Sequence, residues 1–183
     1  MPNETVALGI SFLAMALIVA SYFFEKKVYF LLFQALGTVF LVLSYLFSGE
    51  YFAMIGLSIG LCRTLTYFFF ERRNKTAPIY CVVLFCALTL AAYFTVNLGI
   101  LKTAKPIDIF YVASLILYAI VFRIKDVELM RYLVLLPTAL AVLYNVLCAA
   151  PVFTTVSYAF EVAAGVCAVI KFNILGQKEK RTK

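Results

Sequence analysis

Histidine and tryptophan are both absent from the 183-residue sequence, and charged residues make up only 14% of it. Without His, haem ligation, His-ligated metal sites and Ser-His-Asp catalysis all lack their central residue. The five Cys are scattered through apolar runs with no C-x-x-C spacing, which favours neither a zinc site nor a disulfide framework. We therefore expect no catalytic residue, no metal and no cofactor.

Apolar residues, by contrast, make up 65% of the chain, and the mean hydropathy is +1.02. A typical soluble domain is about half apolar and about a quarter charged. A globule of this size cannot hide so much apolar surface from water. Seven spans of ~20 residues would use ~140 positions, which leaves no room for a separate soluble domain. The composition predicts an all-α, multi-pass membrane protein.

Seven apolar segments are predicted to cross the membrane as helices, with short connections between them. The fifth segment is the shortest and follows Pro106, which suits the first turn of a helix. The predicted spans are 5–24, 28–47, 51–70, 77–96, 107–122, 129–149 and 152–172.

Basic residues are distributed unevenly over the connections. Thirteen of the sixteen Lys and Arg lie in the first, third and fifth connections and in or near the tail, whereas Lys102 and Lys105 lie on the other side and Arg63 lies inside a span. The positive-inside rule then places the N-terminus outside and the C-terminus in the cytoplasm. The net charge of +7 is thus a topology signal and not a nucleic-acid site, and the basic tail also suits contact with anionic membrane lipids.

Weak internal similarity divides the seven spans into three, one and three. Gly60-Leu61-Cys62 recurs as Gly165-Val166-Cys167, and Ser44-Tyr45 corresponds to Tyr144-Asn145. Two triplets with the same orientation form a parallel repeat about an axis along the membrane normal, as in SWEET transporters. We expect a single transmembrane domain, 1–183, made of a first half (1–75), a linker helix and loop (76–105), and a second half with the basic tail (106–183).

Arg63 and Glu161 are the two unequivocal charges inside predicted spans. A cation at the centre of a membrane helix costs roughly 2.5–3.5 kcal/mol on insertion scales, so a functional site is the default hypothesis. Three alternatives remain for Arg63: it reaches the lipid headgroups, it pairs with Glu161, or it contacts a solute. Glu161 is either charged or protonated, since desolvation favours the neutral carboxyl group.

Four further polar residues complete the candidate substrate-binding set. Gln34 lies at a depth similar to that of Arg63, Thr64 and Tyr67 surround Arg63 with hydroxyl groups, and Asn145 lies near the outer end of the sixth span. The structural alternative is that each of these side chains forms a hydrogen bond between packed helices.

Several short matches resemble one family over nearly the whole chain. They are Arg63-Thr64, Met130-Arg131, Tyr144-Asn145 and Glu161, and together they resemble the YgjV family of bacterial inner membrane proteins. That family usually has His-Asn at 144–145 and Arg-Phe where this chain has Lys171-Phe172. These departures weaken any claim that an imidazole is needed, and they leave the charge at position 171 intact. The resemblance implies seven helices in a three-one-three arrangement, a distant similarity to PQ-loop and SWEET proteins, and a solute path. It supplies no substrate and no catalytic residue.

Three classes of function fit this sequence to different degrees. The first is a transporter or facilitator of a small polar solute through a cavity between the halves. The alternative is a receptor or scaffold that works through its basic cytoplasmic face. An enzyme is disfavoured because, without His, it would depend on Glu161 or on carboxyl groups at the membrane boundaries. The expected partners are membrane lipids and a small solute, without nucleic acid, and assembly into a homo-oligomer is left open.

Overall fold

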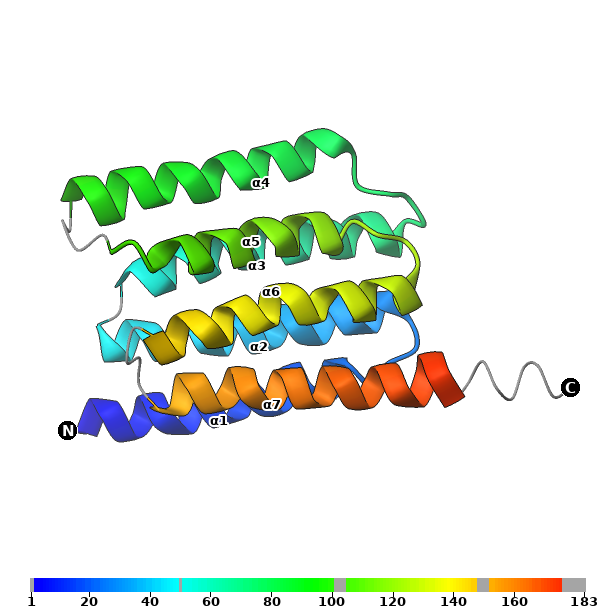
Figure 1. The fold of residues 1–183 in the computed structure, drawn as a ribbon, viewed down its shortest axis with the longest axis horizontal. Coiled ribbons are helices and arrows are strands. Elements are labelled where there is room, and N and C mark those ends of the chain that lie inside the picture. The colour runs from blue at the N-terminus through cyan, green and yellow to red at the C-terminus, as the bar shows by residue number, and fades with distance from the viewer. Residues whose placement is uncertain (1, 50, 101–104, 148–151, 176–183) are drawn as a thin grey trace, which may run out of the picture.

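The computed structural model describes residues 2–49, 51–100, 105–147 and 152–175, which form seven α-helices and no strand (Figure 1). The all-helical fold predicted from composition is therefore confirmed for the described part of the chain. The helices are α1 (Pro2–Ser21), α2 (Lys27–Ser48), α3 (Tyr51–Arg72), α4 (Ile79–Ala92), α5 (Asp108–Val121), α6 (Val127–Leu147) and α7 (Val152–Ala168), and α4 and α7 continue as the π-helices η1 (Tyr93–Ile100) and η2 (Val169–Leu175).

Helix length separates the seven elements into two groups. Among the described residues, five stretches are long and apolar enough to cross a membrane: Lys27–Phe47, Ala53–Arg72, Ile79–Val96, Val127–Leu147 and Thr155–Phe172. Val6–Ser21 and Asp108–Val121 are shorter apolar helices. The first span was predicted to reach residue 24, but α1 ends at Ser21, and the chain then turns.

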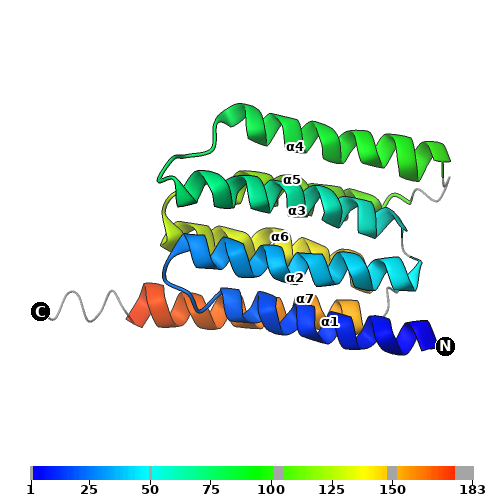
Figure 2. The ribbon, with the colours of Figure 1, turned by 180° about the vertical axis from the view of Figure 1, so that it is seen from behind.

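The helices form two facing layers. One layer contains α1, α2 and α3, the other contains α7, α6 and α5, and α4 packs along the edge formed by α3 and α5 (Figures 1 and 2). At the opposite edge α1 packs against α7. Small residues allow close packing within a layer. A Cβ on Gly37 of α2 would lie 2.5 Å from Ile18 Cγ1 and 3.1 Å from the Ala14 carbonyl oxygen of α1.

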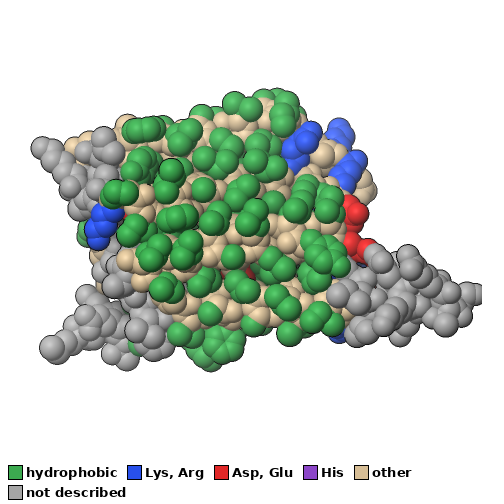
Figure 3. All heavy atoms as spheres, viewed as in Figure 1, with side chains coloured by type: hydrophobic (Ala, Val, Ile, Leu, Met, Phe, Trp, Pro, Cys, Tyr) green, Lys and Arg blue, Asp and Glu red, His purple; other side chains and the backbone are tan. Residues whose placement is uncertain are grey.

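The loops 22–26, 73–78 and 122–126 meet at one end of the bundle, which we call the basic end. Between the two ends, the surface in Figure 3 is covered mainly by apolar side chains, as a membrane requires. At the basic end, Lys27 Nζ lies 3.1 Å from Glu71 Oε2, which joins the start of α2 to the end of α3. Arg123 donates to the Ala77 carbonyl (3.0 Å) and Arg131 donates to the Phe24 carbonyl (2.8 Å). Cationic side chains thus hold these loops together.

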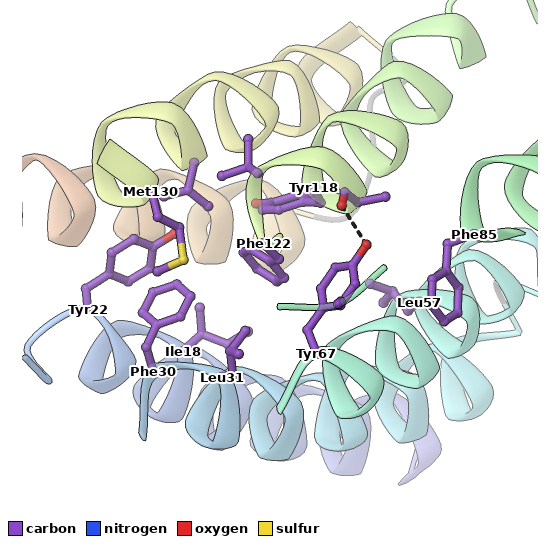
Figure 4. Close-up of a cluster of buried hydrophobic side chains, with 14 of the residues drawn as sticks. Ile18, Tyr22, Phe30, Leu31, Leu57, Tyr67, Phe85, Tyr118, Phe122 and Met130 are labelled. Carbon is purple, nitrogen blue, oxygen red and sulfur yellow. Dashed lines mark hydrogen bonds between the residues drawn. The ribbon is translucent and has the colours of Figure 1, made fainter. Parts of the chain in front are cut away.

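Buried aromatic side chains close the interior on the same side (Figure 4). The Tyr22 and Phe30 ring centroids are 5.4 Å apart, and those of Phe30 and Phe122 are 5.8 Å apart. Met130 is fully buried beside them. We call Tyr22, Phe30 and Phe122, together with Met130, the aromatic cluster. Each lies in the first helical turn after a basic-end loop or just after a helix ends there, so the cluster lies toward the basic end.

Candidate solute-binding cavity

A cavity of about 50 Å³ lies between the two layers and is lined by α1, α2, α3, α5 and α7 together with Phe122. This volume holds a few water molecules, which require polar partners. Nine of its fifteen lining residues are polar, although apolar atoms form most of the cavity wall. The polar lining residues are Gln34, Thr38, Arg63, Thr64, Tyr111, Ser114, Tyr118, Tyr158 and Glu161.

Helical spacing explains why these side chains converge. In α3, Gly60, Arg63 and Thr64 are three and four positions apart, which places them on one face. In α5, Tyr111, Ser114 and Tyr118 follow the same rule over two turns. The cavity therefore lies where two polar stripes of otherwise apolar helices face each other.

The Arg63 guanidinium lies inside the bundle, not at the lipid headgroups. Its side chain is only 6% exposed, and Nη1 donates to the Leu115 carbonyl of α5 at 2.7 Å. The guanidinium carbon lies 5.5 Å from the ring centroids of both Tyr118 and Phe122. Within the described part of the chain, Nε has no hydrogen-bond partner. A buried cation with an unused donor thus borders the cavity.

The Glu161 carboxyl group is surrounded by hydroxyl and amide donors. Tyr22 donates to Oε1 at 2.8 Å, and Tyr118 donates to the same oxygen at 3.4 Å. Tyr118 also shares a 2.6 Å hydrogen bond with Thr138. The Gln34 amide, which donates to Ser21 Oγ at 3.1 Å, interacts with the carboxyl group as well. Residues of α1, α2, α5 and α6 therefore orient a single carboxyl group on α7.

Arg63 and Glu161 line the same cavity, but among the ion pairs of the described residues none joins them. Tyr118 lies between the two charges. Its ring faces the guanidinium, and its hydroxyl group reaches the carboxyl group. The direct pair considered from the sequence is thus replaced by an indirect connection through a tyrosine.

The other predicted site residues divide into two groups. Gln34 and Thr64 line the cavity, although the Thr64 hydroxyl donates to the Gly60 carbonyl of its own helix at 2.9 Å. Tyr67 and Asn145 do not belong to the lining. Tyr67 donates to the Ala119 carbonyl at 2.7 Å, and Asn145 donates to the Ala141 carbonyl at 2.8 Å. These two contacts stabilise helices and helix packing.

Sequence reasoning missed the tyrosines that hold the carboxyl group. Tyr22 follows α1 directly, inside a stretch that was predicted to be helical, and Tyr118 belongs to the polar stripe of α5. The spacing of Tyr111, Ser114 and Tyr118 was the available signal. Lys102 and the basic tail beyond residue 175 lie outside the described residues.

Within the described ranges, no group of three His, Cys, Asp or Glu side chains is placed to hold a metal ion. The cavity therefore offers charge, hydroxyl groups and aromatic faces to a ligand. Such a lining can bind and orient a polar molecule.

Comparison with known families agrees with the resemblance noted in the sequence. A family model described as bacterial inner membrane protein, Imp-YgjV, matches residues 5–174. No curated protein and no solved structure matches the chain. The matched range includes the seven helices except the first three residues of α1, and it contains the cavity and both Arg63 and Glu161. The chain therefore belongs to the YgjV family of bacterial inner membrane proteins.

Proposed function

We propose that the protein is a transporter or facilitator that lets a small polar solute cross the inner membrane through the cavity between its two helical layers. The observation that carries this proposal is the pair of buried charges, Arg63 and Glu161, which border one cavity without pairing. Charges inside a membrane are costly and generally mark a solute or ion path. A scaffold that works through its surface has no need for them.

The proposal includes a three-one-three architecture in which α1–α3 and α5–α7 are parallel repeats, distantly similar to PQ-loop and SWEET proteins. The order of packing supports this arrangement, because α2 lies between α1 and α3 just as α6 lies between α5 and α7. Superposition of the two triplets in an experimental structure tests this repeat.

Transport requires the cavity to open toward one side of the membrane at a time. Toward the basic end, the aromatic cluster covers the cavity. Toward the other end, the Tyr111 hydroxyl group of α5 donates to the Ala53 carbonyl of α3, in the facing layer, at 3.4 Å. Rocking of one layer against the other would separate one of these contacts while the other stays closed.

Cysteine accessibility tests whether the cavity opens. The five native Cys are first replaced, and Ser114, a small residue of the lining, becomes Ser114→Cys. In membrane vesicles of either orientation, we expect a hydrophilic thiol reagent to modify this residue.

The matched control for this experiment is Thr89→Cys. Thr89 is also buried, but it lies on α4 and donates to the Phe85 carbonyl away from the cavity. It should stay unmodified. Equal protection of both positions from both sides would overturn the transport proposal and favour the scaffold.

A further inference from the structure

We propose that the solute is a small zwitterion whose carboxylate binds Arg63 and whose ammonium group binds Glu161. This inference rests on the proposed function and adds the class of substrate to it. It comes from the arrangement of donors and acceptors around the cavity.

Arg63 is suited to bind a carboxylate. A guanidinium carries five N–H donors in a planar fork that matches the two oxygens of a carboxylate. The hydrogen bond to the Leu115 carbonyl uses Nη1, whereas Nε has no partner in the part of the chain that the structure describes. Since the side chain is only 6% exposed, lipid and bulk water do not satisfy this donor. Gly60 adds space, because even a Cβ there would lie 3.5 Å from Nη2.

Glu161 is suited to bind an ammonium group. An ionised carboxyl group accepts about four hydrogen bonds, and the hydroxyl groups of Tyr22 and Tyr118 both donate to one oxygen, Oε1. The rings of Tyr118 and Tyr158 line the same cavity, and aromatic faces attract cations. A second small cavity of about 10 Å³ also borders Glu161 and Tyr158. The carboxyl group thus has open space on more than one side.

The balance of charge selects a zwitterion over singly charged solutes. An anion compensates Arg63 but leaves Glu161 unpaired and adds a like charge to the cavity, and a cation has the converse effect. A neutral polyol leaves both buried charges uncompensated. A molecule with both charges compensates both residues and enters the membrane with no net charge. The small cavity, of about 50 Å³, favours short molecules such as β-alanine over larger ones.

Four probes of similar size test this charge preference with the purified, full-length protein. They are β-alanine (zwitterion), lactate (anion), ethanolamine (cation) and lactamide (neutral). The melting temperature in detergent is measured with each probe, and uptake of labelled β-alanine into proteoliposomes follows. We expect β-alanine to raise the melting temperature most and to enter proteoliposomes faster than empty liposomes. This ranking requires no variant, so it stands even if a variant fails to fold.

Two variants then change the charge preference of the cavity. Arg63→Gln removes the positive charge, and Glu161→Gln removes the negative one. Each should weaken β-alanine binding by about tenfold or more, since a charge-assisted contact is lost. Ethanolamine should still change the melting temperature of Arg63→Gln, because Glu161 is intact in that variant. Lactate should still change the melting temperature of Glu161→Gln, because Arg63 is intact there. Thr89→Val, outside the cavity, should keep β-alanine uptake unchanged.

The outcomes separate this inference from the function on which it rests. If lactate, ethanolamine or lactamide stabilises wild type as much as β-alanine does, the zwitterion proposal is overturned while transport stands. If none of the four probes shifts the melting temperature, the zwitterion proposal also fails. Labelling of Ser114→Cys then decides independently whether the cavity opens at all.

Discussion

At the scale of single residues, many hydroxyl and amide groups bond to the backbone of their own helix. Thr64, Thr138 and Asn145 each donate to the carbonyl four positions earlier. Such bonds satisfy a polar side chain without any partner helix. Asn145 was predicted as a site residue but lies outside the cavity lining, where this local bond satisfies its amide group. Thr64 forms the same kind of bond and does line the cavity. A polar residue in an apolar segment therefore does not by itself indicate a solute path.

Tyrosine poses the opposite problem for sequence reasoning. The chain has 12 Tyr, a residue type that is common at membrane interfaces. Tyr22 is fully buried against Glu161, yet its position just after α1 is also where an interfacial tyrosine would be expected. The rotation of each helix decides which tyrosines face inward, and that rotation depends on packing between helices. Arg63 and Glu161, by contrast, could be predicted as candidate site residues, because a charge inside a membrane span is costly however the helices pack.

The strength of the Tyr22 contact is testable against a matched tyrosine. Tyr22→Phe removes a 2.8 Å bond to a carboxyl group, whereas Tyr67→Phe removes a 2.7 Å bond to a neutral carbonyl. Both side chains are at most 2% exposed. Hydrogen bonds to charged groups contribute about 1.5–3 kcal/mol and neutral ones about 0.5–1.5 kcal/mol. We expect Tyr22→Phe to lower the free energy of unfolding more, as measured by denaturant titration in detergent. Equal losses would indicate that Glu161 is neutral in the folded protein.

At the scale of helices, hydrophobic length predicted the number of elements and their approximate positions. The ends were predicted less well, because apolar composition continues past them. The fourth span was predicted as 77–96, whereas α4 begins at Ile79 after Pro78 and continues through a π-helix to Ile100. Pairing of the helices depended on small residues such as Gly37, whose contacts no single segment reveals.

The close approach of α1 and α2 leads to a second prediction. Gly37→Ala places a methyl group within 2.5 Å of Ile18 and within 3.1 Å of the Ala14 backbone, so the two helices must separate. Overpacking of this kind costs about 1–3 kcal/mol. Gly9→Ala, also within this helix pair, meets nothing within 4 Å and should change the free energy of unfolding by less than about 1 kcal/mol. Unfolding in mixed micelles measures both. Similar values for the two variants would contradict close packing at Gly37.

At the scale of the whole molecule, the uneven distribution of basic residues predicts the orientation in the membrane. The basic end carries the exposed cations Lys26, Arg72, Arg73, Lys75 and Lys125. Because positive residues are retained in the cytoplasm, we expect a reporter fused after Lys183 to be active there. A reporter inserted at 101–104 should be active outside. Reversal at both positions would refute the orientation, and the same side for both would refute the three spans predicted between them.

The short length of α5 bears on the membrane potential. Its 14 residues span about 21 Å, less than the ~30 Å of a hydrocarbon core, and its residues line the cavity from Tyr111 to Tyr118. On the proposed function, a solute moving beside α5 would cross a shorter stretch of the voltage drop. A zwitterion with charges ~3 Å apart would gain only about 0.3 kcal/mol from alignment at 100 mV, since a full charge crossing gains about 2.3 kcal/mol. That energy is below thermal energy, so the voltage would orient the zwitterion only weakly. Because the zwitterion carries no net charge, the voltage would also not set the direction of its net movement.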